Sequence, residues 1–322
     1  MSAGEDRRWL AAAASLAARA LPLSRPNPAV GALIVRDGKV VGRGWTGVGG
    51  RPHAEAVALD HAGDLARGAT LYVTLEPCAH LSKRGPACAD LAVAAGLERV
   101  VIGCGDPDSR TSGQGIARMA AAGVATELVS SRECAESLAG YLSRCRTGRP
   151  YVTLKLATSL DGCIALGNGE SRWITGEAAR AHGHAVRARS DAILVGGETL
   201  RADNPRLDVR LPGLEERGPQ RWVLTRGEAP PGWAAVPAPQ AIGQAGQEQY
   251  LLIEGGAGAA AAFLMADLVD RLLIYRAPVV IGGGRPSVAD IGLASLDAAH
   301  GRWRMSDHLR LGSDTLEVYQ RA

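Results

Sequence analysis

The residues of this sequence with the clearest chemical potential are one histidine, one glutamate and two cysteines. His53 and Glu55 lie two positions apart, and Cys78, directly after Pro77, precedes Cys88. Zinc binds one imidazole and two thiolates while keeping a fourth position open for water. It lowers the pKa of such a water toward neutrality, and a nearby carboxylate can move the protons. The pattern predicts a metal site of His53, Cys78 and Cys88 with Glu55 as the catalytic acid and base.

The elements expected around these residues bring the ligands together. A break at residues 49–52 (GGRP) precedes an expected helix at 53–62, and residues 69–75 (ATLYVTL) predict a buried strand. The proline after that strand delivers Cys78 to a loop or a helix start, and an expected helix at 88–95 begins at the second cysteine. Because a helix N-terminus favours thiolate over thiol, this arrangement suits a metal.

The order of these residues resembles the H-x-E…P-C…C signature of zinc nucleoside and nucleobase deaminases. Taken singly, H-x-E is typical of a surface helix turn and Pro-Cys of a buried small hydrophobe. The joint order and the flanking turns favour the metal site over these interpretations. Cys88 follows Cys78 by ten residues, whereas C-x-x-C is the common spacing, so a longer loop is expected here.

Composition limits the class of protein. The 322 residues predict two domains, and 46% hydrophobic with 21% charged residues is typical of a soluble globular protein. A net charge of +3 argues against nucleic-acid binding. The sequence has no run of about 18 apolar residues, so no membrane span is predicted. Glu5 and Asp6 do not suit a signal peptide, and six cysteines in such a chain do not predict a disulfide framework. We therefore expect a cytoplasmic location.

The first half, residues 1–147, predicts alternating strands and helices, which form a sheet with helices on both faces. A tight hairpin turn is expected at Asp37-Gly38-Lys39. The site should lie at the strand ends, where the loops collect. The expected helices are 7–21, 53–62, 88–95, 115–122 and 133–146, and the expected strands are 29–35, 40–45, 69–75, 99–103 and 124–128.

Four segments carry a closer resemblance: residues 27–31 (NPAVG), 53–55 (HAE), 74–80 (TLEPCAH) and 86–88 (PAC). They are similar to the deaminase half of bacterial bifunctional riboflavin-biosynthesis enzymes, whose loop between the cysteines is long and here one residue longer. The resemblance implies a cytidine-deaminase-like αβα sandwich that binds a phosphoribosyl pyrimidine.

Other residues near the predicted metal site are candidates for substrate contacts. Asn27 could hydrogen-bond the ring edge, or it could be a turn residue before Pro28. His80 is expected to contact substrate, because a fourth protein ligand would close the metal site. Lys83 and Arg84 could meet a phosphate, or they could belong to a solvated loop.

The second half, residues 148–322, follows a compact linker at 146–150 and also alternates strands and helices. Lys155 lies inside an apolar strand, where an unpaired cation would be costly. The Gly256-x-Gly258-x-x-Ala261 segment between a strand and a helix can bind a phosphate. Arg276 stands where a Rossmann fold places an acid, so a different NADP fold is favoured. The expected strands are 151–157, 192–196, 249–253, 272–277 and 315–319, the expected helices are 177–189, 198–202 and 259–268, and 227–249 is expected to be a loop.

Segments throughout this half are similar to the reductase half of the same enzymes, among them 155–162 (KLATSLDG), 169–175 (GESRWIT), 192–196 (AILVG), 202–205 (ADNP) and 254–256 (EGG). The resemblance implies a dihydrofolate-reductase-like α/β domain with NADPH as cofactor. It implies NADPH contacts by Ala157, Trp173, Thr199, Asp203, Gly256, Ala257, Gly258, Ala259, Ala260, Ala261 and Ala262, and substrate contacts by Lys155, Ser171, Arg187, Leu207, Arg210 and Glu254.

The whole resemblance implies two reactions in one chain. The first is deamination of 2,5-diamino-6-(5-phosphoribosylamino)pyrimidin-4(3H)-one by zinc-activated water, and the second is NADPH reduction of the ribosyl group of 5-amino-6-(5-phosphoribosylamino)uracil. The expected partners are these small molecules and further copies of the chain, with neither nucleic acid nor membrane. One alternative is a deaminase of nucleobases or RNA, which the 4% aromatic content disfavours. Another is a deaminase whose second domain is degenerate and only structural or dimerising, because 227–249 is short and no Asp follows the strand near 221–226.

Overall fold

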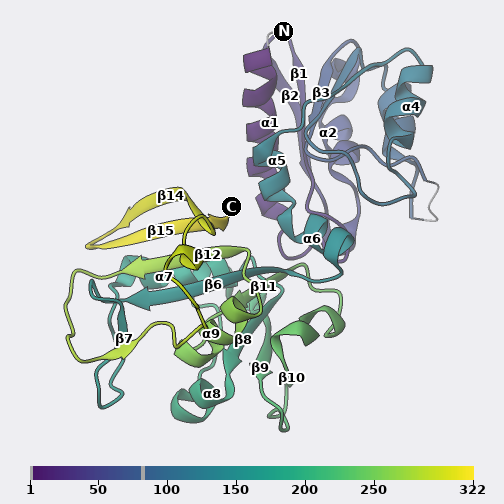
Figure 1. Ribbon diagram of the computed structural model, residues 1–322. Coiled ribbons are helices and arrows are strands. Elements are labelled where there is room, and N and C mark those ends of the chain that lie inside the picture. The colour runs from purple at the N-terminus through teal and green to yellow at the C-terminus, as the bar shows by residue number, and fades with distance from the viewer. Residues whose placement is uncertain (1–2, 81–83) are drawn as a thin grey trace. The chain divides into compact units, whose positions relative to one another are not determined.

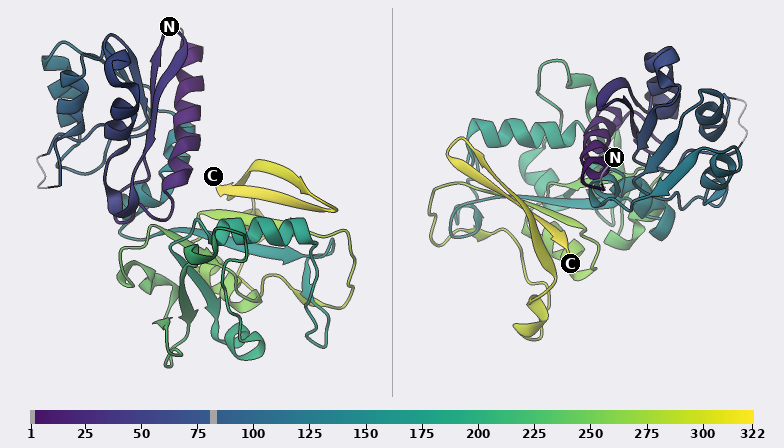
Figure 2. Two further views of the ribbon diagram at one scale, coloured as in Figure 1. Left: turned by 180° about the vertical axis from the view of Figure 1, so that it is seen from behind. Right: turned by 90° about the horizontal axis from the view of Figure 1, so that it is seen from above.

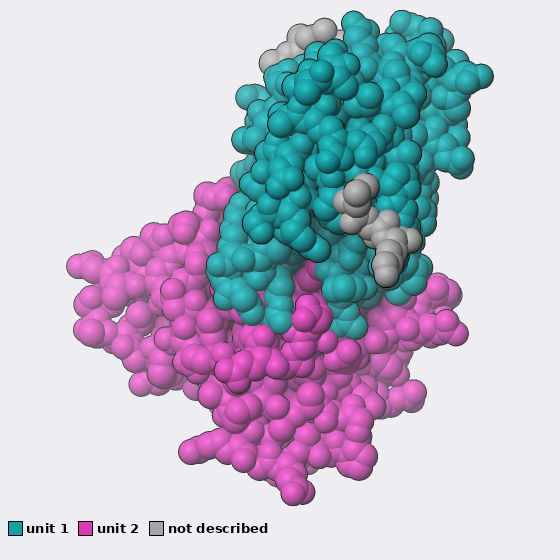
Figure 3. All heavy atoms as spheres, turned by 90° about the vertical axis from the view of Figure 1, so that its right-hand side faces the viewer, with its two compact units in different colours: residues 1–148 teal, residues 149–322 magenta. Residues whose placement is uncertain are grey.

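The computed structural model describes residues 3–80 and 84–322. The chain divides into two compact units, residues 1–148 and residues 149–322 (Figure 3). Each unit has its own sheet and its own hydrophobic core. None of the helices formed by the described residues combines the length and the apolar composition needed to cross a bilayer.

The first unit contains a mixed sheet with the strand order β2-β1-β3-β4-β5. β1 is antiparallel to both β2 and β3, whereas β3, β4 and β5 are parallel. The predicted hairpin turn joins β1 to β2, since Arg36 pairs with Lys39. The strands are β1 Gly31–Arg36, β2 Lys39–Trp45, β3 Thr70–Val73, β4 Arg99–Ile102 and β5 Ala125–Leu128.

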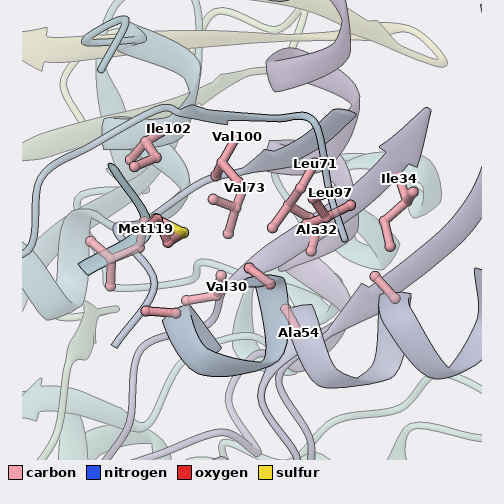
Figure 4. Close-up of a cluster of buried hydrophobic side chains, with 14 of the residues drawn as sticks. Val30, Ala32, Ile34, Ala54, Leu71, Val73, Leu97, Val100, Ile102 and Met119 are labelled. Carbon is pink, nitrogen blue, oxygen red and sulfur yellow. The ribbon is translucent and has the colours of Figure 1, made fainter. Parts of the chain in front are cut away.

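Helices cover both faces of this sheet, and the alternation of β1 shows why. Ala32 and Ile34 enter one core cluster, which also contains residues of α2, α3 and α4, while Leu33 and Val35 enter a second cluster with α1 and α5 (Figures 1 and 4). Side chains of a strand alternate between faces, so a fully buried strand needs two apolar layers. The predicted αβα sandwich is confirmed. The helices are α1 Ala3–Ala17, α2 Ala54–Ala62, α3 Cys88–Ala94, α4 Gln114–Ala121, α5 Arg132–Ser137 and α6 Ala139–Thr147, with short 3-10 turns at Ala18–Ala20, Val48–Gly50 and Gly63–Ala66.

Two glycines of β2 allow α2 to lie unusually close to the sheet. A Cβ atom on Gly42 would lie 2.2 Å from the carbonyl oxygen of Ala58, and one on Gly44 would lie 2.2 Å from that of Ala54. Only glycine fits such an approach, because any side chain would overlap helix backbone. This contact fixes the N-terminus of α2, and with it the predicted metal ligand at position 53.

The second unit contains a larger sheet with the order β10-β9-β8-β11-β6-β12-β15-β14. The strands from β10 to β12 in this order are parallel, and the β14–β15 hairpin adds antiparallel strands at the end of the sheet (Figure 2). The strands are β6 Tyr151–Thr158, β8 Ala192–Gly196, β9 Gln220–Leu224, β10 Trp233–Val236, β11 Tyr250–Ile253, β12 Arg271–Arg276, β14 Trp303–Leu311 and β15 Asp314–Arg321, with a separate pair of β7 Cys163–Ala165 and β13 Arg285–Pro286.

The two faces of β6 have different surroundings. Val152, Leu154 and Leu156 belong to the core cluster that contains residues of α9, whereas Ala157 packs against a second cluster that includes Ala179 of α7. Side-chain alternation therefore places Lys155 on the α7 face of the sheet. The predicted reductase-type α/β fold is confirmed. The helices are α7 Glu177–Arg187, α8 Gly197–Asp203 and α9 Ala257–Met265, and 3-10 turns lie at Glu215–Arg217, Pro239–Gln244 and Asp297–Ala299.

Several boundaries differ from the sequence prediction. The prediction of a loop at 227–249 was wrong. This segment contains β10, whose Val236 is buried in the core, and a 3-10 turn, whose Ile242 is also buried there. The edge strand β14 was not predicted, since its exposed residues are mostly polar. The helix expected at 133–146 breaks at Leu138. Because β10 forms one end of the sheet, residues 227–249 belong to the folded core of the second unit.

Candidate active sites

The predicted zinc ligands meet in the first unit. His53 Nδ1 lies 3.2 Å from Cys88 Sγ and 3.5 Å from Cys78 Sγ, and the three ligand atoms all lie within 4.8 Å of one another. A tetrahedral zinc ion with bonds of 2.0–2.3 Å needs donor separations of roughly 3.5 Å. Two thiolates and one imidazole also suit zinc chemically. The three residues therefore fit this metal, and His80 is not part of the cluster.

Two of the ligands lie at helix N-termini, and the third lies in the loop after β3. His53 is the residue immediately before α2, Cys78 follows β3, and Cys88 is the first residue of α3. The backbone N–H of Cys88 donates a hydrogen bond to Cys78 Sγ at 3.4 Å. A helix N-terminus thus stabilises negative charge on this sulfur, as the sequence suggested.

The protonation of the site agrees with cation binding. A hydrogen bond from Cys88 lowers the pKa of Cys78 to about 3, whereas the same interaction and burial raise the pKa of Cys88. The lowered pKa of Cys78 favours the thiolate form that a zinc ligand requires. Burial raises the pKa of Glu55, whose side chain is 3% exposed, so its carboxyl group can hold a proton closer to neutrality.

A cavity of about 250 Å³ opens beside these residues. His53, Glu55 and Cys78 line it, together with the predicted substrate residues Asn27 and His80. Asn27 Nδ2 donates to the carbonyl of Gly50 at 3.3 Å, and His80 Nδ1 lies 3.4 Å from Thr111 Oγ1. The substrate roles of both residues remain predictions, but the structure places both side chains at the cavity wall.

The sequence prediction named two basic residues, Lys83 and Arg84, in the loop between the two cysteines. Arg84 lines the cavity and donates a hydrogen bond to the carbonyl of Gly49 at 2.8 Å. Lys83 lies outside the described residues. Arg51 and Arg110 also line the cavity and were not predicted. Arg110 is paired with Asp108, whereas Arg51 and Arg84 donate to the backbone carbonyls of Pro86 and Gly49. The guanidinium groups of Arg51 and Arg84 therefore suit a phosphate-bearing molecule better than that of Arg110.

Glu76 is a buried carboxylate that the sequence prediction treated only as the end of a strand. Its oxygens accept hydrogen bonds from the backbone N–H groups of Gly113, Gly115 and Ile116 at 3.1–3.3 Å, with a longer one from Asp106. It therefore fixes the loop that precedes α4. That loop carries the cavity-lining residues between 106 and 111, so Glu76 positions one wall of the site.

The second unit contains a larger cavity of about 620 Å³. It is formed by β6, α7 and the loops beside them. The structure brings seven of the predicted residues to its wall: Lys155, Ala157, Ser171, Trp173, Arg187, Arg210 and Glu254. It does not bring Thr199, Asp203, Leu207 or residues 256–262 to this cavity, and Leu207 is 5% exposed.

A buried carboxylate organises the cations of this cavity. Arg187 binds both oxygens of Glu254, at 2.7 and 2.9 Å, and Lys155 Nζ lies 3.5 Å from Glu254 Oε2. Burial alone would raise the pKa of Glu254, but the Lys155 ammonium and the Arg187 guanidinium lower it to about 2. The strand lysine singled out in the sequence therefore has its counter-charge.

The predicted cofactor residues at 199 and 256 meet at the ends of parallel strands. Thr199 Oγ1 accepts a hydrogen bond from the backbone N–H of Gly256 at 3.0 Å. Gly256 immediately precedes α9, so the helix begins at Ala257 and Gly258 lies inside it rather than in a preceding turn. The first N–H groups of α9 lack partners within the helix and can bind a phosphate. The side chains of Ala259 to Ala261 are buried, so contacts to a nucleotide there must come from backbone.

The cavity residues of the second unit that were absent from the sequence prediction include Arg180, His184 and Tyr275. The guanidinium of Arg180 lies 4.8 Å from the centre of the Trp173 ring. Tyr275 is 1% exposed, and its hydroxyl lies 2.7 Å from His182 Nδ1. In the sequence these residues are ordinary members of a helix and an apolar strand, and only tertiary packing brings them together.

The fold and the His/Cys/Cys site define the class of this protein as a zinc deaminase domain joined to a reductase-type α/β domain. Residues 3–104 match the cytidine and deoxycytidylate deaminase zinc-binding region, and residues 150–237 and 235–316 match the RibD C-terminal domain. The chain is 33% identical to riboflavin biosynthesis protein RibD of Aquifex aeolicus, with 98% of each chain covered. It is 38% identical to RibD of Escherichia coli over 86% of this chain and 89% of that one.

Solved structures are similar to this chain over almost its whole length. RibD of Acinetobacter baumannii is 35% identical, with a TM-score of 0.86 and 99% of each chain covered. A Thermotoga maritima diaminohydroxyphosphoribosylaminopyrimidine deaminase/5-amino-6-(5-phosphoribosylamino)uracil reductase is 29% identical, with a TM-score of 0.85 over 98% of this chain and 99% of that one. The chain belongs to the RibD family. It is a bifunctional deaminase and reductase of riboflavin biosynthesis, with zinc and NADPH as cofactors.

Proposed function

We propose that the first unit deaminates 2,5-diamino-6-(5-phosphoribosylamino)pyrimidin-4(3H)-one and that the second unit reduces the ribosyl group of 5-amino-6-(5-phosphoribosylamino)uracil to ribityl. The observation that carries this proposal is the joint presence of the His53/Cys78/Cys88 cluster beside Glu55 and of the Lys155/Glu254/Arg187 network. The His53/Cys78/Cys88 cluster with Glu55 suits hydrolytic release of an amine, and the Lys155/Glu254/Arg187 network suits binding of a phosphorylated sugar.

In the deaminase unit, His53, Cys78 and Cys88 hold the metal and Glu55 moves the protons. A zinc ion in this site supplies Lewis acidity that lowers the pKa of a water toward neutrality. Glu55 lines the same cavity, and its carboxyl group would carry a proton from the attacking water to the departing ammonia. Asn27 and His80 contact the pyrimidine, and the arginines of the cavity wall orient the phosphate.

In the reductase unit, Arg187 and Arg210 bind the phosphate of the substrate, and Glu254 holds Lys155 and Arg187 in the cavity. Ser171 at the cavity wall is a further proposed substrate contact. Leu207 is also proposed, although it is buried and does not line this cavity. NADPH supplies the hydride when bound. Ala157, Trp173, Thr199, Asp203 and residues 256–262 are the proposed cofactor contacts. Their support is the exposed Trp173 ring at the cavity and the free helix terminus after Gly256.

The cysteines and the net charge bear on the cellular location and the partners of the enzyme. We infer a cytoplasmic homo-oligomer whose partners are small molecules rather than nucleic acid. None of the six cysteines, all of which lie in the described residues, forms a disulfide, as expected in a reducing compartment. The net charge of +3 gives no basic surface of the kind that binds a nucleic-acid backbone.

A two-step assay tests the proposed substrates. Zinc-loaded protein is given the diaminopyrimidinone ribosyl phosphate with NADPH, and ammonia release and NADPH oxidation are followed together. We expect ammonia first and then oxidation of one NADPH per ammonia. Absence of ammonia contradicts the deaminase assignment. Ammonia without NADPH oxidation supports the alternative of a structural second domain.

A further inference from the structure

His184 lines the reductase cavity but has no role among the residues assigned above. It lies in α7, one helical turn after Arg180 and three residues before Arg187. Residues at such spacings share one face of a helix, and all three line the cavity. The imidazole therefore belongs to the wall that also carries the proposed phosphate ligand Arg187.

A single carbonyl fixes the orientation of this imidazole. The backbone oxygen of Asp208 lies 3.2 Å from His184 Nδ1 and accepts a hydrogen bond from Arg187 Nη1 at 2.9 Å. Because a carbonyl oxygen can only accept, His184 Nδ1 must carry the proton. The same carbonyl thus sets the tautomer of His184 and the position of Arg187, and it joins α7 to the loop that carries Arg210.

The other ring nitrogen of His184 has no protein partner among residues 3–80 and 84–322. Burial and the neighbouring Arg187 guanidinium lower the pKa of His184, and Arg210 acts in the same direction. Glu254 and the hydrogen bond to Asp208 oppose this change without reversing it. The ring is therefore neutral at pH 7, and Nε2 offers a lone pair that accepts a hydrogen bond.

We propose that His184 accepts, through Nε2, a hydrogen bond from a hydroxyl group of the sugar in the reductase substrate. This inference rests on the proposed function of the second unit. A neutral imidazole with a protonated Nδ1 cannot bind phosphate through Nε2, whereas a hydroxyl donates to it readily. Arg187 and Arg210 occupy the phosphate end of the sugar, so the hydroxyls of the same sugar are the donors within reach. His184 is thus a specificity-determining residue for ribosyl over deoxyribosyl substrates.

Two variants test the roles of the two ring nitrogens of His184 separately. His184→Asn places an amide N–H near the position of Nδ1, so it keeps the bond to Asp208 and loses the acceptor. His184→Gln places an amide oxygen near the position of Nε2 and keeps an acceptor. The substrates are 5-amino-6-(5-phosphoribosylamino)uracil and its 2′-deoxy and 3′-deoxy analogues, and kcat/KM is measured by NADPH oxidation.

We expect the wild-type protein to prefer the ribosyl substrate over one of the deoxy analogues by about 10-fold, the range of one neutral hydrogen bond. In His184→Asn this preference should fall to within about twofold, and His184→Gln should restore most of it. Ammonia release and NADPH binding should match the wild type in both variants, which shows that they are folded.

A wild-type preference that persists unchanged in His184→Asn would overturn the inference, and so would a wild-type protein that does not distinguish the three substrates. Failure of the proposed function has a different signature. In that case the wild-type protein oxidises no NADPH with any of the three substrates, and the inference fails with it.

Discussion

Replacement of Glu254 by glutamine removes the one anion that Lys155 and Arg187 share. The Glu254 side chain is 9% exposed, and the side chains of its two partners are 23% and 16% exposed. Glutamine keeps the shape and can still accept a hydrogen bond. It leaves two poorly hydrated cations beside each other without a counter-charge, which is the costly way to break a buried ion pair.

The size of the effect follows from the pKa of Glu254. Its value of about 2, against an ordinary value of 4.5, corresponds to about 3 kcal/mol at about 1.4 kcal/mol per pH unit. A lowered carboxyl pKa stabilises the folded state fully above about pH 4.5, and this stabilisation is lost as the pH falls toward 2. Glu254→Gln should therefore reduce the free energy of unfolding of the second unit by about 3 kcal/mol at pH 7. The difference from wild type should shrink at acid pH.

Hydrogen exchange of the buried strands measures this change unit by unit. Amides of β8 and β11 report the second unit, and those of β1 and β3 serve as an internal control in the first. Asp267→Asn is a matched control in the second unit, because Asp267 pairs with arginines but is 62% exposed. It should change stability by well under 1 kcal/mol. A Glu254→Gln protein as stable as this control at pH 7 would show that the buried network does not stabilise the second unit.

Three further predictions concern single residues. Cys88→Ser should lower the zinc content below one ion per chain and stop ammonia release, as elemental analysis and an ammonia assay can show; full zinc content would contradict the ligand assignment. Glu76→Gln should raise KM for deamination and speed amide exchange at residues 106–116 by about 10-fold, because an amide cannot accept all the N–H groups that the carboxylate accepts; unchanged exchange would remove its positioning role. Arg187→Lys should raise KM for the reductase substrate by about 10-fold or more, since lysine cannot make the bidentate contact with Glu254 that holds the guanidinium in the cavity; equal weakening of NADPH binding would argue for a general structural defect.

The predicted deaminase site was accessible from sequence because its signals are local. His53 follows a Gly/Pro turn, and each cysteine adjoins the end of a strand or the start of a helix. The roles of Glu76 and His184 were not accessible in the same way. The first depends on backbone N–H groups about 30 to 40 positions later in the chain, and the second on a carbonyl 24 positions away. Such hydrogen bonds exist only after the loops have packed.

The errors in predicting the fold also have physical causes. β14 is an edge strand with exposed polar residues, so it lacks the apolar alternation that identifies a half-buried strand. β10 is short and contains two consecutive alanines, yet its pairing with β9 makes it part of the sheet. In both cases the neighbouring strand, rather than the intrinsic preference of the segment, decides the structure.

Glu55→Gln tests most directly whether one chain carries two separable reactions. Zinc-loaded Glu55→Gln protein is given either the diaminopyrimidinone ribosyl phosphate or the already deaminated uracil derivative, each with NADPH. We expect no ammonia from the first substrate and NADPH oxidation at the wild-type rate with the second. Ammonia release at the wild-type rate from the first substrate, or loss of reduction of the second, would contradict this expectation.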